Sequence, residues 1–227
     1  MLSLSPATLI SRAIVLLVAM AVHEFAHAYV AYRMGDPTAK EQGRMTLDPR
    51  ANIYWPGFIV GVLIGFAILG SAPVNPYRMR NRRWGMFAAV VAGPVSNLLI
   101  AILAAIPLRL GLFDPSFNNT ILGGMLPSVG MLLTDMMWLN ILLFVFNLLP
   151  LFPLDGWTAV LSALPPGPAV WWERRRMESQ YALFGLIALS FIAPRLAAIS
   201  PVLGYADLLN LLIGQPSVRI AQFLLGI

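Results

Sequence analysis

The chain contains no cysteine and only two histidines among its 227 residues. The absence of cysteine excludes disulfide bonds and thiolate metal ligands, so a metal site has to be built from histidine and carboxylate side chains. Charged side chains are also scarce, at 11% of the residues, whereas 59% are hydrophobic. This balance is too apolar for a soluble domain of this length and predicts an integral membrane protein.

The charges that are present are mostly basic, and the net charge is +5. Nucleic-acid-binding proteins often have such an excess. Here, however, the arginines lie in short loops that flank apolar segments, and the sequence shows neither a basic helix face nor a nucleic-acid-binding motif. We therefore expect the lipid bilayer, and not nucleic acid, to be the partner of these charges.

Three long apolar segments are predicted to span the membrane, at residues 7–32, 84–108 and 129–149. The first follows Ser5 and Pro6, which are a typical N-cap and first helical residue. No basic stretch precedes it, so we expect it to be retained and not cleaved as a signal peptide. Residues 180–193 begin a further helix, and residues 202–213 either span or lie along the surface. The predicted fold is an all-α polytopic membrane bundle with three core helices and one or two C-terminal helices.

Two shorter segments lie between the first and second spans. Residues 38–53 alternate in polarity around Gly43 and are predicted to form a short strand or hairpin at the membrane surface. Residues 58–69 are apolar, short and bounded by turn residues, a pattern typical of a re-entrant segment that leaves the membrane on the side it entered.

Both histidines lie in one motif, His23-Glu24-Phe25-Ala26-His27, inside the first apolar helix. Residues four apart on a helix are separated by roughly 40° around the axis and about 6 Å along it, so His23 and His27 can bind one metal ion. In zinc hydrolases the Glu of this motif takes a proton from the attacking water, which makes Glu24 a candidate general base. Burying these three groups in hydrocarbon costs several kcal/mol unless it is compensated, so they indicate a functional site.

Asp155 is a candidate for the third metal ligand. It follows Pro150 and Pro153, which interrupt helical hydrogen bonding, and we expect it on irregular backbone beside a cavity, where such backbone is tolerated at membrane depth. A carboxylate there would leave a fourth position open for water. Asp135, midway along the third span, is the alternative ligand. Asp155 also has a non-functional interpretation, because an Asp before Gly is an ordinary turn residue.

Asn97 lies inside the second span, close to Gly93 and Pro94. An amide in hydrocarbon needs hydrogen-bond partners. Two interpretations are equally supported: Asn97 lines the polar site, or it forms a plain hydrogen bond between helices.

Together these motifs resemble the signatures of the site-2 protease family of intramembrane zinc metalloproteases, which are H-E-x-x-H, an A-G-P element and N-x-x-P-x-x-P-x-D-G on successive membrane segments. Their positions here, in family order, are His23 to His27, Ala92-Gly93-Pro94, and Asn147 to Gly156. The similarity covers roughly residues 10–160. The chain departs from the pattern at Trp157, where a second Gly is common, and at Asn52, where a His is frequent, and neither change removes a ligand.

The resemblance implies one zinc ion (Zn2+) per chain, bound by His23, His27 and Asp155, with Glu24 as the base. It also implies that Asn147 lies at the active site and assists oxyanion stabilisation. The implied reaction is hydrolysis of peptide bonds in or near the transmembrane helix of a membrane-protein substrate. Residues 1–160 would form the metalloprotease core, and residues 161–227 would be accessory.

Two other functions fit the same motifs. The first is a non-catalytic membrane binding protein that keeps the fold and its zinc. The second is a metal carrier, which is less well supported because two histidines and one aspartate provide few relay ligands along a path. The sequence identifies neither the substrate nor the oligomeric state.

The metal site also constrains the topology. His23, His27 and Asp155 must reach the same side of the bilayer to share a metal, which requires residues 58–69 not to cross. The basic residues on the side of the motif are then Arg33, Lys40, Arg44, Arg50, Arg78, Arg80, Arg82, Arg83, Arg174, Arg175 and Arg176. Arg12 and Arg109 lie opposite. The positive-inside rule predicts a multi-pass protein of the cytoplasmic membrane whose active site faces the cytosol.

Overall fold

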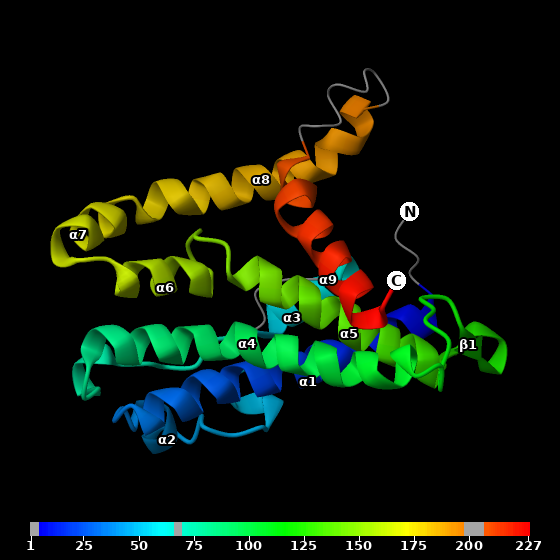
Figure 1. Ribbon diagram of the computed structural model, residues 1–227, viewed down its shortest axis with the longest axis horizontal. Coiled ribbons are helices and arrows are strands. Elements are labelled where there is room, and N and C mark those ends of the chain that lie inside the picture. The colour runs from blue at the N-terminus through cyan, green and yellow to red at the C-terminus, as the bar shows by residue number, and fades with distance from the viewer. Residues whose placement is uncertain (1–4, 66–69, 198–206) are drawn as a thin grey trace.

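The computed structural model describes residues 5–65, 70–197 and 207–227, and it shows a helical bundle (Figure 1). The long helices α1 (Pro6–Arg33), α4 (Arg82–Arg109) and α5 (Val129–Asn147) pack side by side. Among the described residues, these three helices are long and apolar enough to cross a membrane. The predicted all-α architecture with three core helices is confirmed.

Helix α1 begins where the sequence predicts. The Ser5 hydroxyl accepts a hydrogen bond from the backbone N–H of Thr8 at 3.2 Å, and Pro6 is the first helical residue. At the other end, Gly35 has a φ of +108°, a backbone conformation that favours glycine. The chain therefore leaves the helix immediately after the first predicted span.

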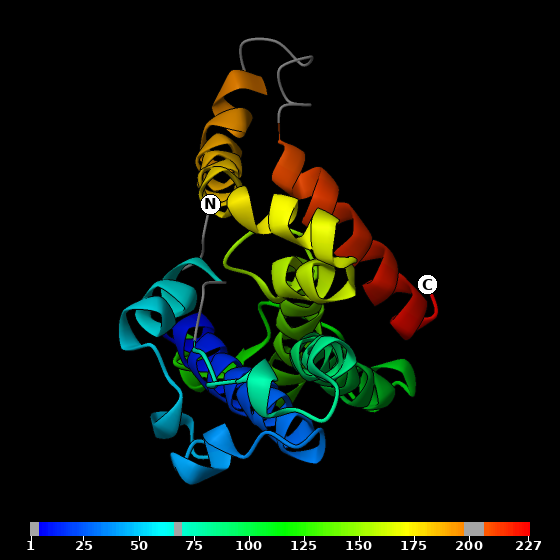
Figure 2. The same ribbon diagram turned by 90° about the vertical axis from the view of Figure 1, so that its left-hand side faces the viewer.

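The core positions the motif on α1. Leu16 and Met20 are buried against Leu139 and Leu143 of α5. On a helix, positions 16, 20, 23 and 27 follow one stripe, so the face that packs the core also carries His23 toward the inside of the bundle. Figure 2 shows the bundle turned by 90°, with α3 (Trp55–Ile64) on the outer side of α1.

The predicted hairpin at residues 38–53 is wrong. The segment contains a one-turn helix, α2 (Thr38–Glu41), and a 3-10 turn, η1 (Pro49–Ala51), and only Ile53 forms a β-bridge, with Gly70. Side chains satisfy backbone groups that a hairpin would pair. Arg44 donates to the carbonyl of Ala51 at 3.2 Å, and such side-chain bonds cannot be read from alternation in the sequence.

Helix α3 forms the first part of the predicted re-entrant segment, whose residues 66–69 lie outside the described part of the chain. The bridge between Ile53 and Gly70 makes the two ends of the segment neighbours on one side of the bundle, which is the arrangement that a re-entrant segment requires. At the inner end, Arg12 of α1 donates to the carbonyl of Leu63 at 3.1 Å, which favours this position because a cation complements a helix C-terminus.

The third span ends at Asn147, and the prolines that follow interrupt the helix as predicted. Asp155, however, does not lie on irregular backbone, because it is the first residue of α6 (Asp155–Ala163). An aspartate in the first turn complements the positive end of the helix dipole. Helix α6 packs on α4, so the carboxylate of Asp155 is held against the bundle.

The rest of the chain is mostly helical. The loop between α4 and α5 contains a two-stranded sheet, β1 (Thr120–Ile121) paired antiparallel with β2 (Leu126–Pro127), joined by the 3-10 turn η3 (Leu122–Gly124). A further 3-10 turn, η2 (Pro76–Arg78), precedes α4. The C-terminal elements are α7 (Pro166–Arg174), α8 (Arg176–Ala197), the π-helical turn η5 (Asn210–Gly214) and α9 (Gln215–Leu225).

The C-terminal predictions hold in part. Helix α8 contains the predicted residues 180–193 and extends beyond them at both ends. Residues 202–206 of the predicted segment 202–213 lie outside the described part of the chain, and the remainder leads through η5 into α9. Helix α9 packs on α4 and α5, so the C-terminal part is joined to the bundle.

Candidate metal centre

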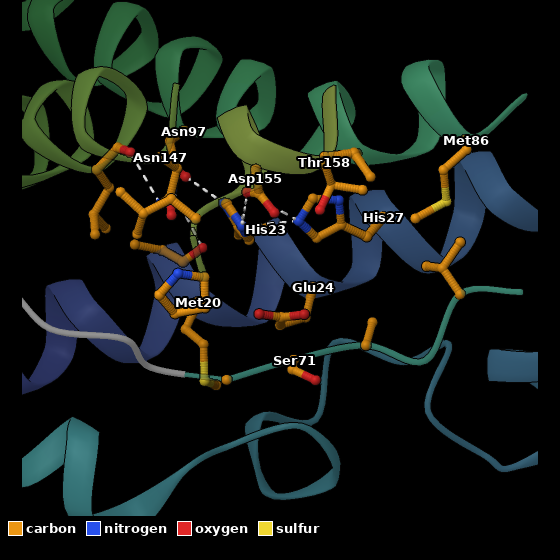
Figure 3. Close-up of a pocket in the computed structure, with 18 residues that line it drawn as sticks. Met20, His23, Glu24, His27, Ser71, Met86, Asn97, Asn147, Asp155 and Thr158 are labelled. Carbon is orange, nitrogen blue, oxygen red and sulfur yellow. Dashed lines mark hydrogen bonds and ion pairs between the residues drawn. The ribbon is translucent and has the colours of Figure 1, made fainter. Parts of the chain in front are cut away.

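His23, His27 and Asp155 meet at one point between α1 and α6 (Figure 3). The Nε2 atoms of the two histidines are 2.9 Å apart. Asp155 Oδ2 lies 3.1 Å from Nε2 of His23 and 3.4 Å from Nε2 of His27. The structure thus brings together the three residues that the sequence predicts as metal ligands, although Asp155 lies more than 120 positions after the two histidines.

The other ring nitrogen of each histidine has an acceptor. Nδ1 of His27 lies 2.8 Å from the backbone carbonyl of Ala89, which can only accept, and Nδ1 of His23 lies 2.6 Å from Oδ1 of Asn97. Each Nδ1 therefore carries the proton in the neutral ring, and each Nε2 presents a lone pair. This is the tautomer that metal-binding histidines need.

Three unprotonated donor atoms consequently face one another. Among the described residues, Asp155 Oδ2 is buried without a hydrogen-bond partner. Lone pairs at these distances repel unless a cation lies among them. In a tetrahedral zinc site with bonds of about 2.0–2.1 Å, donor atoms are about 3.3 Å apart, close to the observed spacing. The residues present therefore fit a zinc ion.

Gly93 of α4 provides the space beside these donors. A Cβ atom at position 93 would collide with Nε2 of both His23 and His27. The A-G-P element therefore has a steric role at this site: only glycine lets the α4 backbone approach the imidazoles this closely.

Glu24 lies next to the donors in a cavity of about 250 Å³. Its side chain is buried, and its Oε2 has no hydrogen-bond partner within the described part of the chain. Figure 3 shows its carboxylate between the imidazoles and Ser71 on the segment that follows Gly70. An unpaired buried carboxylate is expensive, so its position indicates a partner in the cavity.

Asn147 lines the same cavity from the end of α5. Its Nδ2 donates to the carbonyl of Leu143 at 3.0 Å. An amide nitrogen carries two hydrogens, so a second hydrogen remains for another acceptor. The position agrees with that expected from the motif.

Asp135, the alternative third ligand, lies elsewhere. Its carboxylate accepts a 2.5 Å hydrogen bond from the Ser11 hydroxyl and lines a different cavity, which contains Arg12. The candidate metal group found among the described residues does not include it.

The structure also resolves the two interpretations of Asn97, because both are correct. The amide lines the cavity and bonds His23, and it donates to Oδ1 of Asn140 on α5 at 2.9 Å. Sequence reasoning missed Asn140. It is an amide in the middle of an apolar span, seven residues and hence two turns before Asn147, and that combination would have flagged it.

Comparison with known proteins places these features in a family. Residues 11–182 match the family model described as Peptidase family M50. The chain is 38% identical over 154 residues to a Bacillus subtilis (strain 168) protein named "Putative zinc metalloprotease YwhC", covering 68% of this chain and 69% of that protein. It is 34% identical over 188 residues to a Mycobacterium tuberculosis (strain H37Rv) protein named "Putative zinc metalloprotease Rip2", covering 79% and 66%. No solved structure matches the chain.

Proposed function

This chain belongs to Peptidase family M50, a membrane-embedded family of zinc metalloproteases, and we propose that it cleaves peptide bonds in or near the transmembrane helix of a membrane-protein substrate. Its metal is zinc. The observation that carries the proposal is the convergence of three lone-pair donors beside an unpaired buried glutamate.

We assign the metal ligands as Nε2 of His23, Nε2 of His27 and Oδ2 of Asp155. Zinc held by these atoms supplies Lewis acidity, which polarises a carbonyl oxygen and makes a water molecule a stronger acid. Glu24 and Asn147 line the cavity next to the ligands, where a substrate carbonyl would lie. Residues 1–160 contain all five side chains and form the proposed catalytic unit, and residues 161–227 are accessory.

The chain's own groups carry the proton. Glu24 accepts it from the water whose oxygen attacks the peptide carbonyl carbon, and then delivers it to the leaving nitrogen as the C–N bond breaks. The second amide hydrogen of Asn147 is directed at the negative charge that develops on the carbonyl oxygen. The products are a carboxylate end and an amine end of the cut chain.

The location of the site explains why a membrane substrate is favoured. His23, Glu24 and His27 lie within α1, one of the three helices able to span a bilayer. A helical substrate has its carbonyls engaged in hydrogen bonds, so it has to unwind locally before one reaches the cavity. Residues with low helix propensity near the cut site are expected to help.

The test is a cleavage assay on the full chain purified in detergent, with bound metal measured in parallel. We expect about one zinc per chain, cleavage of some members of a panel of single-span substrates, and loss of cleavage with a chelator that added zinc reverses. Glu24→Gln is expected to retain zinc and to lower turnover by roughly 100- to 10,000-fold, the usual contribution of a general base.

Each outcome separates the functions. Unchanged turnover in Glu24→Gln would rule out Glu24 as the base. A protein that binds zinc but leaves every substrate intact would be a zinc-holding binding protein. Cleavage that persists when no metal is bound would contradict the whole proposal.

A further inference from the structure

A chain of buried amides connects the metal centre to α5. Asn97 on α4 and Asn140 on α5 are both fully buried, with no exposed side-chain surface. Asn97 contacts His23, Asn140 contacts Asn97, and Nδ2 of Asn140 donates to the backbone carbonyl of Met136 at 2.8 Å. Three core helices are therefore linked through two side chains.

The direction of this chain is fixed at its far end. The Met136 carbonyl can only accept, so Asn140 must turn its Nδ2 toward it and its Oδ1 toward Asn97. Asn97 must then turn its Nδ2 toward Asn140, which leaves its Oδ1 facing His23. Asn97 Nδ2 also donates a weak 3.4 Å hydrogen bond to the Ala19 carbonyl, which favours the same orientation of the amide.

We propose that Asn140 is a positioning residue for the metal centre: through Asn97 it holds the acceptor oxygen against Nδ1–H of His23 and thereby aims Nε2 at the metal. This inference rests on the proposed function, because it takes His23 to be a ligand. Without Asn140, Asn97 loses its strongest reason to keep this orientation, and the flipped amide would present N–H groups to the N–H of His23.

The central experiment measures zinc affinity, by competition with a chromophoric chelator, in the full chain in detergent. Asn140→Leu keeps the branched shape of the side chain and removes its hydrogen bonds to Asn97 and Met136. We expect a 10- to 100-fold weaker zinc affinity, the usual effect of losing a supporting partner of a ligand. Asn140→Asp is expected to stay near the wild-type affinity, because a neutral carboxylic acid donates to Met136 and accepts from Asn97.

A second background distinguishes positioning from packing. In Asn97→Asp the carboxylate has only acceptor oxygens, so it holds His23 whichever way it turns. Adding Asn140→Leu to Asn97→Asp is then expected to leave zinc affinity unchanged or to strengthen it, because the side chain at position 97 no longer depends on the Asn140 amide for its orientation. A purely structural role would give the same loss in both backgrounds.

The control is Thr134→Val, elsewhere on α5, which removes a buried hydroxyl that donates to the Gly130 carbonyl and accepts from the backbone N–H of Ser116. It is expected to lower the unfolding temperature of the metal-free protein without changing zinc affinity. Equal zinc affinity in wild type and Asn140→Leu would overturn the inference while the proposed function stands. Zinc affinity that survives His23→Ala would instead overturn the ligand assignment itself.

Discussion

The arrangement of individual donor atoms decides the chemistry at the residue scale. Nδ1 of each histidine is engaged by an acceptor, and this fixes the lone pair of each Nε2 toward Asp155. All three residues that produce this order, Ala89, Gly93 and Asn97, lie on α4. Helix α4 therefore orients the donors although it supplies none of them.

The ligand set can be tested one residue at a time. His23→Ala, His27→Ala and Asp155→Ala are each expected to weaken zinc binding by more than about 100-fold, since loss of a mere supporting partner already weakens it 10- to 100-fold. Asp135→Asn is expected to keep full zinc content, because its carboxylate bonds Ser11 and not the histidines. Metal analysis of the purified variants decides: an empty site in Asp135→Asn with a full one in Asp155→Ala would reverse the assignment.

At the element scale, the segment after Gly70 is held beside the cavity by a clamp. Nη2 of Arg44 donates to the carbonyl of Ser71 at 2.6 Å, and Nε of Arg44 bonds Asn52 Oδ1 at 3.1 Å. Asn52 in turn donates to the Arg44 carbonyl at 2.9 Å. The irregular segment at residues 38–53 thereby holds Ser71 in place opposite Glu24.

The clamp predicts a local change on substitution. Arg44→Lys loses the planar fork that reaches Ser71 and Asn52 together. Losing one charge-assisted hydrogen bond, about 1.5 kcal/mol, is expected to speed amide hydrogen exchange in residues 70–75 by about tenfold. Arg50→Lys is the matched control, because Arg50 bonds Asp48 within its own turn. Equal exchange in both variants would mean that Arg44 does not hold the segment.

Much of this arrangement could be predicted because it depends on local pattern. The Ser5 cap, the three spans and the interruption after Asn147 follow from apolar runs and from proline and serine chemistry. The requirement to share one metal predicts that His23 and Asp155 lie at the same end of the bundle. These predictions needed no knowledge of how helices pack.

The remaining features depend on contacts between distant segments. The path of residues 38–53 is set by Arg44 and Asn52, whose partners cannot be known before folding. The spacing of Asn140 from Asn147 indicates a shared helix face, but its partner Asn97 lies on another helix, so the bond between the two amides cannot be predicted from that spacing. Asp155 was placed on irregular backbone because proline marks a break but not the residue at which the next helix begins.

At the scale of the whole molecule, the loops on the motif side are tied together. Arg83 at the start of α4 donates to the carbonyls of Ser162 and Ala163 at the end of α6. Arg78 before α4 forms an ion pair with Glu41 in α2. The predicted cytosolic clusters of arginine therefore occur at one end of the bundle, while Arg109 bonds the end of α9, away from the metal centre.

This grouping leads to the last prediction, the orientation of the chain in the bilayer. Basic residues near helix ends favour the cytosolic side, so the end that carries the metal centre is expected to face the cytosol. Because the native chain has no cysteine, a single introduced cysteine reports one position cleanly. Gln42→Cys and Tyr77→Cys, both at exposed positions that flank the re-entrant segment, should react with a membrane-impermeant thiol reagent from the cytosolic side only. Asn118→Cys, beyond the far end of α4, should react only from outside.

Reaction of Gln42→Cys and Tyr77→Cys from opposite sides would make residues 58–69 a crossing helix, against the Ile53–Gly70 bridge. Reaction of both from outside would keep the fold but reverse the orientation, and the substrate would then be cut on the outer side of the membrane.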